Sequence, residues 1–545
     1  MISPENILNW ILFTPLAGAA LVLLIPGERR NLIRLLSNVT MLAGFLVSLP
    51  LVGWFDKTNP GFQFTLSAEW IPSLGVRYEL GIDGISFWLV LLTTLLGFLA
   101  VLSSWAFIQE RVKEYYIMFL LLQTGMLGVF MALDLFLFYV FWEVMLVPMY
   151  FIIGIWGHER RLYAAIKFFL YTLFGSVLML LGILGLYFFH AGVHQSGGVC
   201  PSVGVAGHTV AEVYTFSVPV YLDFARALPF EWQFWIFWAF FISFAIKVPM
   251  FPFHTWLPDA HTEAPTAGSV ILAGVLLKMG SYGLMRFSLP MFPDAAIHAV
   301  PYVVGLSLIA IIYGALVCLM QKDMKKLIAY SSVSHMGFVT LGIFALNQAG
   351  LEGSLLQQIN HGLSTGALFL IVGLLYERRH TREISEFGGL STPMPMFAAI
   401  YLIISLASLG MPLLNGFVGE FVILVGTWQV NRMWAVMAAV GIILAAAYLL
   451  WLYQRVMFGE VTNPKNKTLK DINLREAMTL VPLVVLCFWI GVYPQPYFEA
   501  MRASIQQVVA RVHGAAKPPA PVAAPVQTPA PPAAPAASEE APATR

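Results

Sequence analysis

Long apolar runs separated by short polar connections dominate this chain. Runs of the length that crosses a bilayer as a helix, about 17–25 residues, recur from the amino terminus almost to residue 493. We place the starts of these spans near Ile7, Leu32, Ile82, Glu114, Leu135, Leu162, Gln233, Glu263, Ile297, Lys325, Glu352, Pro395, Met433 and Ala477. The pattern predicts an all-α membrane protein with about fourteen transmembrane helices.

Three segments depart from this pattern. Apolar residues alternate with polar ones between Trp54 and Gly81, which predicts a hairpin outside the membrane. The polar, glycine-rich stretch from about Ala191 to Glu231 is a second extramembrane segment. From about Ala515 the chain consists mainly of Ala and Pro, a composition that cannot bury a core and predicts a disordered, partly polyproline tail.

Composition agrees with a membrane protein and excludes several other classes. Of the 545 residues, 59% are hydrophobic and 11% are charged, whereas soluble proteins carry about 25% charged residues. No basic patch indicates a nucleic-acid partner. The cysteines Cys200, Cys318 and Cys487 are isolated, and no glycine-rich nucleotide motif is present, so we expect neither a metal site nor a cofactor in this chain.

Basic residues concentrate in the connections that follow odd-numbered spans, and this bias predicts that those connections are cytoplasmic. The basic residues are Arg29, Arg30, Arg34, Arg111, Lys113, Arg160, Arg161, Lys322, Lys325, Lys326, Arg378, Arg379, Arg382, Arg455, Lys465, Lys467, Lys470 and Arg475. Both termini then lie on the opposite, periplasmic face, as an even number of helices requires. The length and the tail favour a bacterial inner-membrane protein.

Four ionisable residues, Glu143, Lys247, Lys278 and Glu420, fall deep within apolar runs. Each costs about 2.5–3.5 kcal/mol at a helix centre, so pairing, hydration or a function must offset that cost. Two histidines in apolar segments, His335 and His361, complete a set of groups from which proton relays are built. A structural ion pair between Glu143 and Lys247 is the alternative for those two residues.

Four further polar residues give a weaker indication of function. Lys167 lies less than two turns from Arg161, so it belongs either to the relay in a supporting role or to the membrane interface. His254, Asp259 and His261 flank the end of the seventh span, where we expect interface residues.

Prolines interrupt two spans next to these charges. Pro249 follows Lys247 in ISFAIKVPMFPFHTWLP, and Pro412 precedes Glu420 in SLASLGMPLLNGFVGEF. A proline frees a backbone carbonyl, which is tolerated at membrane depth only where protein or a water-filled cavity receives it. Broken helices 7 and 12 in corresponding positions predict two inverted five-helix repeats, helices 4–8 and 9–13.

The expected organisation has five parts. These are helices 1–3 with the extramembrane hairpin (1–113), the first repeat (114–290), the second, inverted repeat (295–460), helix 14 with a short polar segment (461–514), and the tail (515–545).

Four stretches carry a resemblance to a known family. They are TGMLGVFMALDLFLFYVFWEVMLVPMYF, KVPMFPFHTWLPDAHTEAPTAGSVILAGVLLKMGSYGLMRF, KKLIAYSSVSHMGFV, and the GMP and GFVGEF motifs around Pro412 and Glu420. In them the chain resembles the antiporter-like chain M, or chain 4, subunits of bacterial respiratory complex I, NADH:quinone oxidoreductase. Glu rather than Lys at position 420, together with the first stretch, favours this subunit over its paralogues.

The resemblance implies proton translocation coupled to quinone reduction in other subunits. Glu143 and Lys247 would interact on the fifth and seventh helices, Lys278 would be the middle relay, His335 and His361 would bridge it, and Glu420 would be the terminal site. It implies partners among the other membrane subunits, including paralogous antiporter-like chains, with NADH, FMN, iron–sulfur clusters and quinone bound elsewhere. A subunit of a multisubunit Na⁺/H⁺ antiporter or membrane-bound hydrogenase, and a purely structural scaffold, are the alternatives.

Overall fold

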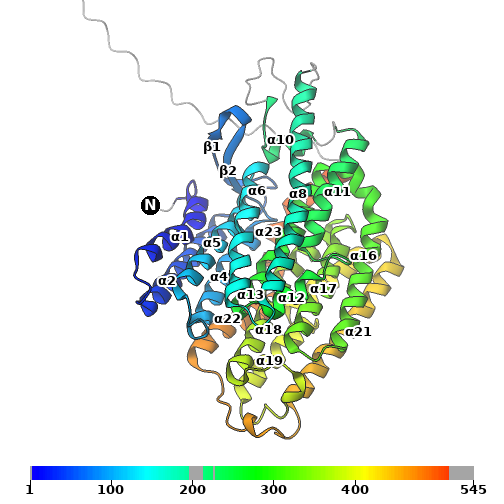
Figure 1. Ribbon diagram of the computed structural model, residues 1–545. Coiled ribbons are helices and arrows are strands. Elements are labelled where there is room, and N and C mark those ends of the chain that lie inside the picture. Colours follow the sequence, from blue (N-terminus) through cyan, green and yellow to red (C-terminus); the bar gives the residue numbers. More distant parts are fainter. Residues whose placement is uncertain (1–2, 196–212, 225–227, 515–545) are drawn as a thin grey trace, which may run out of the picture.

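The computed structural model describes residues 3–195, 213–224 and 228–514, and these form a bundle of helices with one small sheet (Figure 1). The Ala/Pro tail predicted for 515–545 lies outside the described residues. In chain order the helices of the first half are α1 Ile7–Leu24, α2 Arg30–Ser48, α3 Pro50–Trp54, α4 Phe87–Phe107, α5 Val112–Met131, α6 Leu135–Val144, α7 Leu146–Trp156, α8 Arg161–Gln195, α10 Val218–Phe224, α11 Phe230–Lys247 and α12 Trp256–Glu263.

One long span follows α12 and is divided by two π-helical segments, α13 Thr266–Ile271, η3 Leu272–Leu276, α14 Leu277–Gly283, η4 Leu284–Ser288 and α15 Leu289–Met291. The helices of the second half are α16 Pro293–Leu319, α17 Met324–Ile343, α18 Gln348–Arg379, α19 Pro395–Ser408, α20 Asn415–Val430, α21 Arg432–Met457, α22 Leu474–Val492 and α23 Gln495–Val512.

Eleven helical spans among the described residues are long and apolar enough to cross a membrane. The membrane class is confirmed, whereas the predicted number of fourteen is not. The difference comes from α11 and α17, which carry polar side chains within the bundle, and from the predicted span at Pro395, which is divided into the shorter helices α19 and α20.

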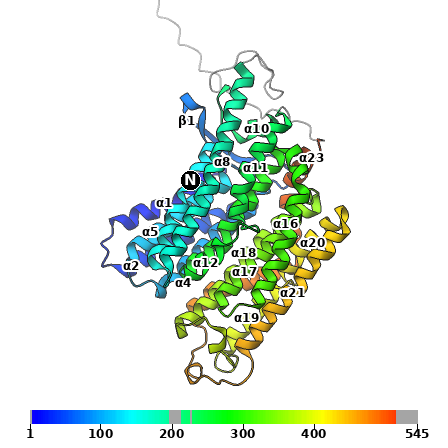
Figure 2. The ribbon, with the colours of Figure 1, turned by 45° about the vertical axis from the view of Figure 1, so that its right-hand side comes forward.

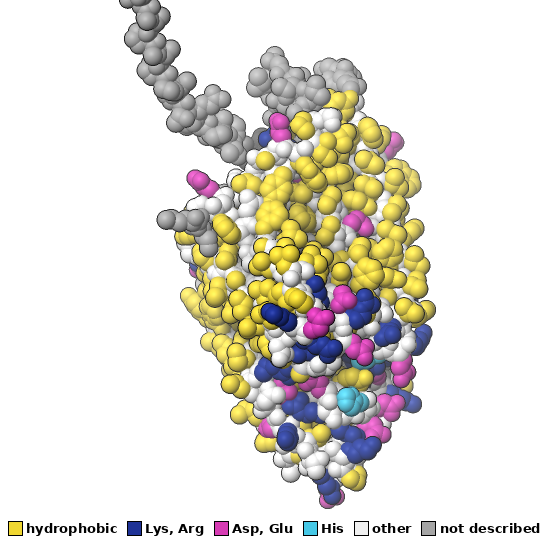
Figure 3. All heavy atoms as spheres, turned by 60° about the vertical axis from the view of Figure 1, so that its left-hand side comes forward, with side chains coloured by type: hydrophobic (Ala, Val, Ile, Leu, Met, Phe, Trp, Pro, Cys, Tyr) yellow, Lys and Arg dark blue, Asp and Glu magenta, His cyan; other side chains and the backbone are white. Residues whose placement is uncertain are grey.

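Charged side chains gather at one end of the bundle, beyond a broad hydrophobic belt (Figure 3). Basic connections far apart in sequence meet there: Arg382 Nη1 donates to the Thr262 carbonyl at 2.7 Å, and Arg378 Nη2 pairs with Glu476 at 2.7 Å. Burial and the nearby cations Lys325 and Arg382 lower the pKa of His158 to about 3. These predicted basic connections therefore share one face.

The predicted hairpin is present at the opposite end (Figure 1). Strands β1 Gln63–Ile71 and β2 Val76–Ile82 pair antiparallel. Gly75 closes their turn with a φ of 69°, and a Cβ there would lie 1.7 Å from the Tyr214 carbonyl oxygen, so only glycine fits. Burial raises the pKa of Glu79, on β2, to about 7.

Both predicted helix breaks are confirmed. Helix α11 ends at Lys247 and α12 begins only at Trp256, while α19 ends at Ser408 and α20 begins at Asn415. A further interruption was not predicted: a single turn residue, Met145, separates α6 from α7 within the span Leu135–Trp156.

Helix α18 runs through the centre of the bundle between α17 and α20 (Figure 2). Three glycines bring α18 and α20 into close contact. A Cβ on Gly353 would lie 2.7 Å from Ile423 N, one on Gly419 would lie 2.4 Å from Gln357 Oε1, and one on Gly426 would lie 2.4 Å from Gly350 N. We call this the α18–α20 glycine contact.

After the last span we expected only a short polar segment, but the chain forms a further helix there. Residues Gln495–Val512 form α23, which packs against α18. Its Ser504 Oγ accepts a hydrogen bond from Gly84 N at 3.0 Å, and its Tyr497 ring stacks on Trp88 at 4.2 Å. Helix α23 therefore ties the start of α4 to the second half of the chain.

Two glycines of α16 give a matched test of this packing. A Cβ on Gly314 would lie 2.9 Å from the backbone nitrogen of Ser334 on α17, whereas one on Gly305 would have no neighbour within 4 Å. Overpacking costs about 1–3 kcal/mol, so Gly314→Ala should lower the temperature at which the assembled protein unfolds. Gly305→Ala should leave that temperature unchanged or raise it, and equal losses in both variants would contradict the packing.

Candidate functional site

Lys278 and His361 form a fully buried pair. Lys278 Nζ and His361 Nδ1 lie 2.7 Å apart, and the two residues are 0% and 1% exposed. The lysine ammonium also donates to the carbonyl of Ala273. That carbonyl belongs to η3, whose π-helical turn directly precedes Lys278; such turns occur mostly as local insertions at functional sites.

His335 and Glu420 form a second buried pair. His335 Nδ1 and Glu420 Oε1 lie 2.7 Å apart, and Gln357 Nε2 donates to the same carboxylate oxygen at 3.0 Å. The other ring nitrogen of His335, Nε2, lies 3.2 Å from the Tyr448 hydroxyl. The break between α19 and α20 positions Glu420, because the chain re-enters the bundle at Asn415 and turns the carboxylate toward α17 and α18.

The two pairs lie next to each other. The rings of His335 and His361 are 6.0 Å apart between centroids, with planes inclined by 60°. Within the described structure, His361 Nε2 and Glu420 Oε2 are buried without a hydrogen-bond partner. The structure thus brings together Lys278, His361, His335 and Glu420 in that order, and we call these four residues the central relay.

Lys247 is the last residue of α11, at the break before α12, and no carboxylate of the described residues lies within salt-bridge distance of it. Its Nζ donates to Met145 Sδ at 3.6 Å and lies 5.2 Å from the Trp142 ring and 5.6 Å from the Phe168 ring. The side chain is 1% exposed. A thioether and two aromatic faces are weak partners for an ammonium group, so Lys247 is held loosely.

Glu143 stands at the end of α6, beside the break at Met145. It acts electrostatically on Lys247, yet the two described side chains form no salt bridge within 4.0 Å. Its Oε1 is buried with no hydrogen-bond partner among the described residues. The alternative of a locked structural ion pair therefore does not describe this arrangement.

Lys167 lies apart from these groups. Its Nζ pairs with Asp259 at 2.7 Å, and the two side chains are 20% and 27% exposed. The pair joins α8 to α12 at a half-exposed position. The prediction that Lys167 supports the relay stays untested.

The prediction that His254 and His261 are interface residues is wrong. His261 is completely buried and stacks on Phe369 at 4.5 Å, and neither of its ring nitrogens has a hydrogen-bond partner in the described part of the chain. His254 is 3% exposed and packs against Tyr313. Both were misjudged because the segment after a helix break folds back into the protein instead of leaving it.

Sequence reasoning also missed an ion pair and a buried lysine. Arg286 and Asp83 are 4% and 3% exposed and form a bidentate pair, and Lys325 is 4% exposed and donates to the Ala264 carbonyl. A signal existed for Arg286, which follows Lys278 in the same apolar run.

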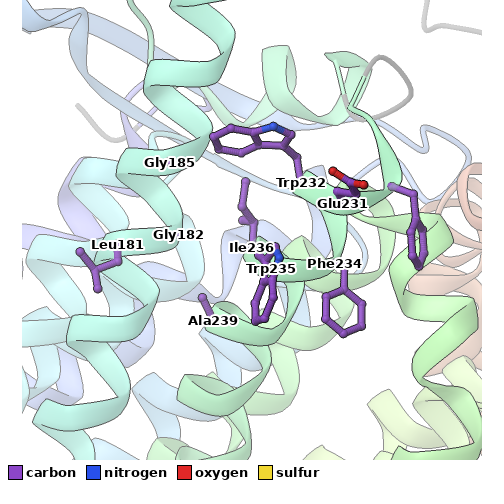
Figure 4. A pocket seen from close by; sticks show the side chains of 10 residues that line it. Leu181, Gly182, Gly185, Glu231, Trp232, Phe234, Trp235, Ile236 and Ala239 are labelled. Carbon is purple, nitrogen blue, oxygen red and sulfur yellow. The ribbon is translucent and has the colours of Figure 1, made fainter.

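An external groove of about 680 Å³ lies between α8 and α11, away from the central relay (Figure 4). Its lining is apolar, with Gly182, Gly185, Trp232 and Trp235, and Glu231 is its one ionisable residue. Among the described residues no three His, Cys, Asp or Glu side chains come together as metal ligands.

Comparisons with known proteins agree with this architecture. Residues 132–445 match the family model described as NADH:quinone oxidoreductase/Mrp antiporter, TM, and residues 34–133 match NADH-ubiquinone oxidoreductase chain 4, amino terminus. NADH-quinone oxidoreductase subunit M of Rhodobacter capsulatus is 48% identical over 524 residues, covering 93% of this chain and 97% of the relative.

Two solved structures share the fold. A chain of respiratory complex I from Thermus thermophilus is 32% identical with a TM-score of 0.80, over 93% of this chain and 99% of that one. A chain of the Mrp complex from Dietzia sp. has a TM-score of 0.78 at 19% identity, over 94% and 99%, and shows the fold alone. The chain therefore belongs to the NADH:quinone oxidoreductase/Mrp antiporter family, and within it to the subunit M, or chain 4, group of respiratory complex I.

Proposed function

We propose that this chain carries protons across the membrane through buried Glu, Lys and His side chains, driven by quinone reduction in partner subunits. The observation that carries the proposal is the central relay, in which two bonded pairs, Lys278–His361 and His335–Glu420, lie side by side. Such groups are expensive in a membrane interior and mark proton relays when they occur together.

The relay geometry defines the steps that a proton takes. At 2.7 Å, Lys278 and His361 share a proton directly, and so do His335 and Glu420. The step between the two histidine rings has no direct hydrogen bond, because the ring centroids are 6.0 Å apart. This step needs ring reorientation or an intervening water molecule, which makes it the natural place to control the flow.

Lys247 and Glu143 supply a switch at the entrance to the first repeat. The ammonium is held only by Met145 and two aromatic rings, so a small movement of α6 changes its distance from the Glu143 carboxylate. Moving one charge against about 150–200 mV costs roughly 3.5–4.5 kcal/mol. A change of about three pKa units in one group is worth about 4 kcal/mol, so one such pair suffices for each proton.

The wider setting forms part of the same proposal. The basic connections face the cytoplasm, both termini face the periplasm, and the chain resides in a bacterial inner membrane. The repeats comprise 114–290 and 295–460, flanked by 1–113 and 461–514. Partners are the other membrane subunits, including paralogous antiporter-like chains, and NADH, FMN, iron–sulfur clusters and quinone are bound by partner subunits. Copurification with flavin and iron–sulfur subunits tests this assignment against an antiporter complex.

Replacing Lys247 or Glu143 should abolish most coupled proton pumping. Lys247→Ala removes the mobile ammonium and Glu143→Ala removes the charge that acts on it, while neither breaks a strong hydrogen bond needed for folding. Pumping is measured by a pH-sensitive dye in sealed vesicles energised with NADH, with assembly checked on native gels. Lys167→Ala, which removes a half-exposed ion pair, should be milder. Full pumping by both Ala variants would refute the switch.

Glu420→Gln should reduce pumping at least tenfold, because an amide keeps the hydrogen bonds to His335 and Gln357 but cannot carry a proton. The matched control is Glu231→Gln in the external groove, which changes the same functional group outside the relay. Initial rates of dye response at equal amounts of assembled complex give the comparison. Equal rates for the two variants would remove Glu420 from the path.

A further inference from the structure

The ion pair between Asp83 and Arg286 occupies the end of the bundle that carries the hairpin. Asp83 directly follows β2, and its Oδ1 accepts hydrogen bonds from Ile85 N at 2.9 Å and Ser86 N at 3.2 Å. Arg286 Nη1 donates to Asp83 Oδ2 at 2.7 Å, and its Nη2 donates to Oδ1. The guanidinium also lies 5.0 Å from the Phe62 ring, which belongs to the loop before β1.

Arg286 lies eight residues after Lys278 in the same span. Positions 278, 282 and 286 form a row with a spacing of four residues, and this row crosses from α14 into the π-helical segment η4, which contains Arg286. Arg286 Nε donates to the Tyr282 hydroxyl at 3.3 Å, which links the last two members of this row. Eight residues correspond to about 12 Å along a helix, so Arg286 stands between Lys278 and the hairpin end of the bundle.

The order of charges along this row matters. Moving outward from Lys278, the row passes Tyr282 and then the guanidinium, and the carboxylate of Asp83 comes from the chain at the base of the hairpin. Arginine stays protonated in proteins, so it cannot pass a proton on. A fixed cation raises the energy of any proton that approaches it.

Stability alone does not explain this pair. A buried ion pair contributes little more than well-packed apolar residues of the same volume, because the desolvation of both charges offsets their attraction. The span that carries Arg286, Thr266–Met291, is otherwise apolar except for Lys278 and small polar groups, and the whole of its most apolar window is buried. A permanent charge that is only 4% exposed therefore points to a role other than stability.

We propose that Arg286 is an electrostatic barrier that closes the short route from Lys278 to the hairpin face of the membrane. Asp83 holds the guanidinium in place and offsets the cost of burying it. The barrier sends a proton from Lys278 sideways to His361 instead of directly outward. This inference rests on the proposed proton relay and adds a residue that confines the proton to it.

A measurement of passive proton leak distinguishes an electrostatic barrier from an ion pair with a purely structural role, which we call the clamp. The assembled complex is reconstituted in liposomes, a pH step is applied without NADH or quinone, and the decay of internal pH is followed. Arg286→Gln removes the charge and should increase the leak by about threefold to tenfold. The upper value is the factor expected for two unit charges about 12 Å apart at an effective dielectric constant of about 20. Asp83 reduces it.

Two variants decide the interpretation. Asp83→Asn breaks the same ion pair but keeps the cation without its counter-charge, so its leak should stay at or below the wild-type level, and Arg286→Lys should also stay tight. A leak in Asp83→Asn equal to that of Arg286→Gln would show that only the clamp matters and would overturn the proposal, as would a tight Arg286→Gln. If Asp83→Asn fails to assemble, a double variant of Arg286→Gln with Lys278→Met carries the decision, because a leak caused by lost structure would persist without Lys278.

A double variant ties the leak to Lys278. In Arg286→Gln with Lys278→Met the leak should return to the wild-type level, because the short route begins at that lysine. A leak that persists would place the route elsewhere and overturn the barrier. Lys278→Met alone tests the relay through NADH-driven pumping, so failure of the proposed function is recognised independently of the leak.

Discussion

An ionisable side chain inside a membrane must find its partners within the protein, and this constraint organises the whole bundle. Lys278 has an imidazole and a backbone carbonyl, and Glu420 has an imidazole and an amide. In lipid, each of these groups would cost several kcal/mol if left alone. The long central helix α18 supplies a partner to each, because His361 and Gln357 lie one turn apart on it and meet Lys278 and Glu420 respectively.

Interrupted helices place the titratable groups where backbone polarity is already exposed inside the protein. Lys247 is the last residue of α11, Glu143 lies at the end of α6, and Glu420 follows the gap between α19 and α20. A broken helix leaves carbonyls and amides without their regular partners. These groups make the local environment polar enough to keep charges and water at a depth where an unbroken helix would exclude both.

Periodicity and the cost of buried charge were enough to predict the membrane class, the hairpin, the breaks after Lys247 and before Glu420, and the burial of Lys278, His335, His361 and Glu420. Contacts between distant segments could not be predicted, because no local pattern in the sequence pairs Lys278 with His361. The interruption at Met145 was missed because no glycine or proline stands at that position; Glu143 and Pro148 are the only disturbances in an otherwise apolar segment. Arg286 and Asp83 were passed over because both lie near the ends of their spans, where a charge usually reaches water.

The α18–α20 glycine contact has a consequence for where solvent can travel. At Gly353 and Gly426 the two backbones approach so closely that a Cβ would lie 2.7 Å from Ile423 N and 2.4 Å from Gly350 N, which leaves no room for a water molecule between them. Both contacts lie on the carboxyl-terminal side of Glu420 along α20, so the space between the two helices is dry on that side of the carboxylate. Any solvent that enters at the gap between α19 and α20 is therefore stopped by the helix packing itself, without a moving part.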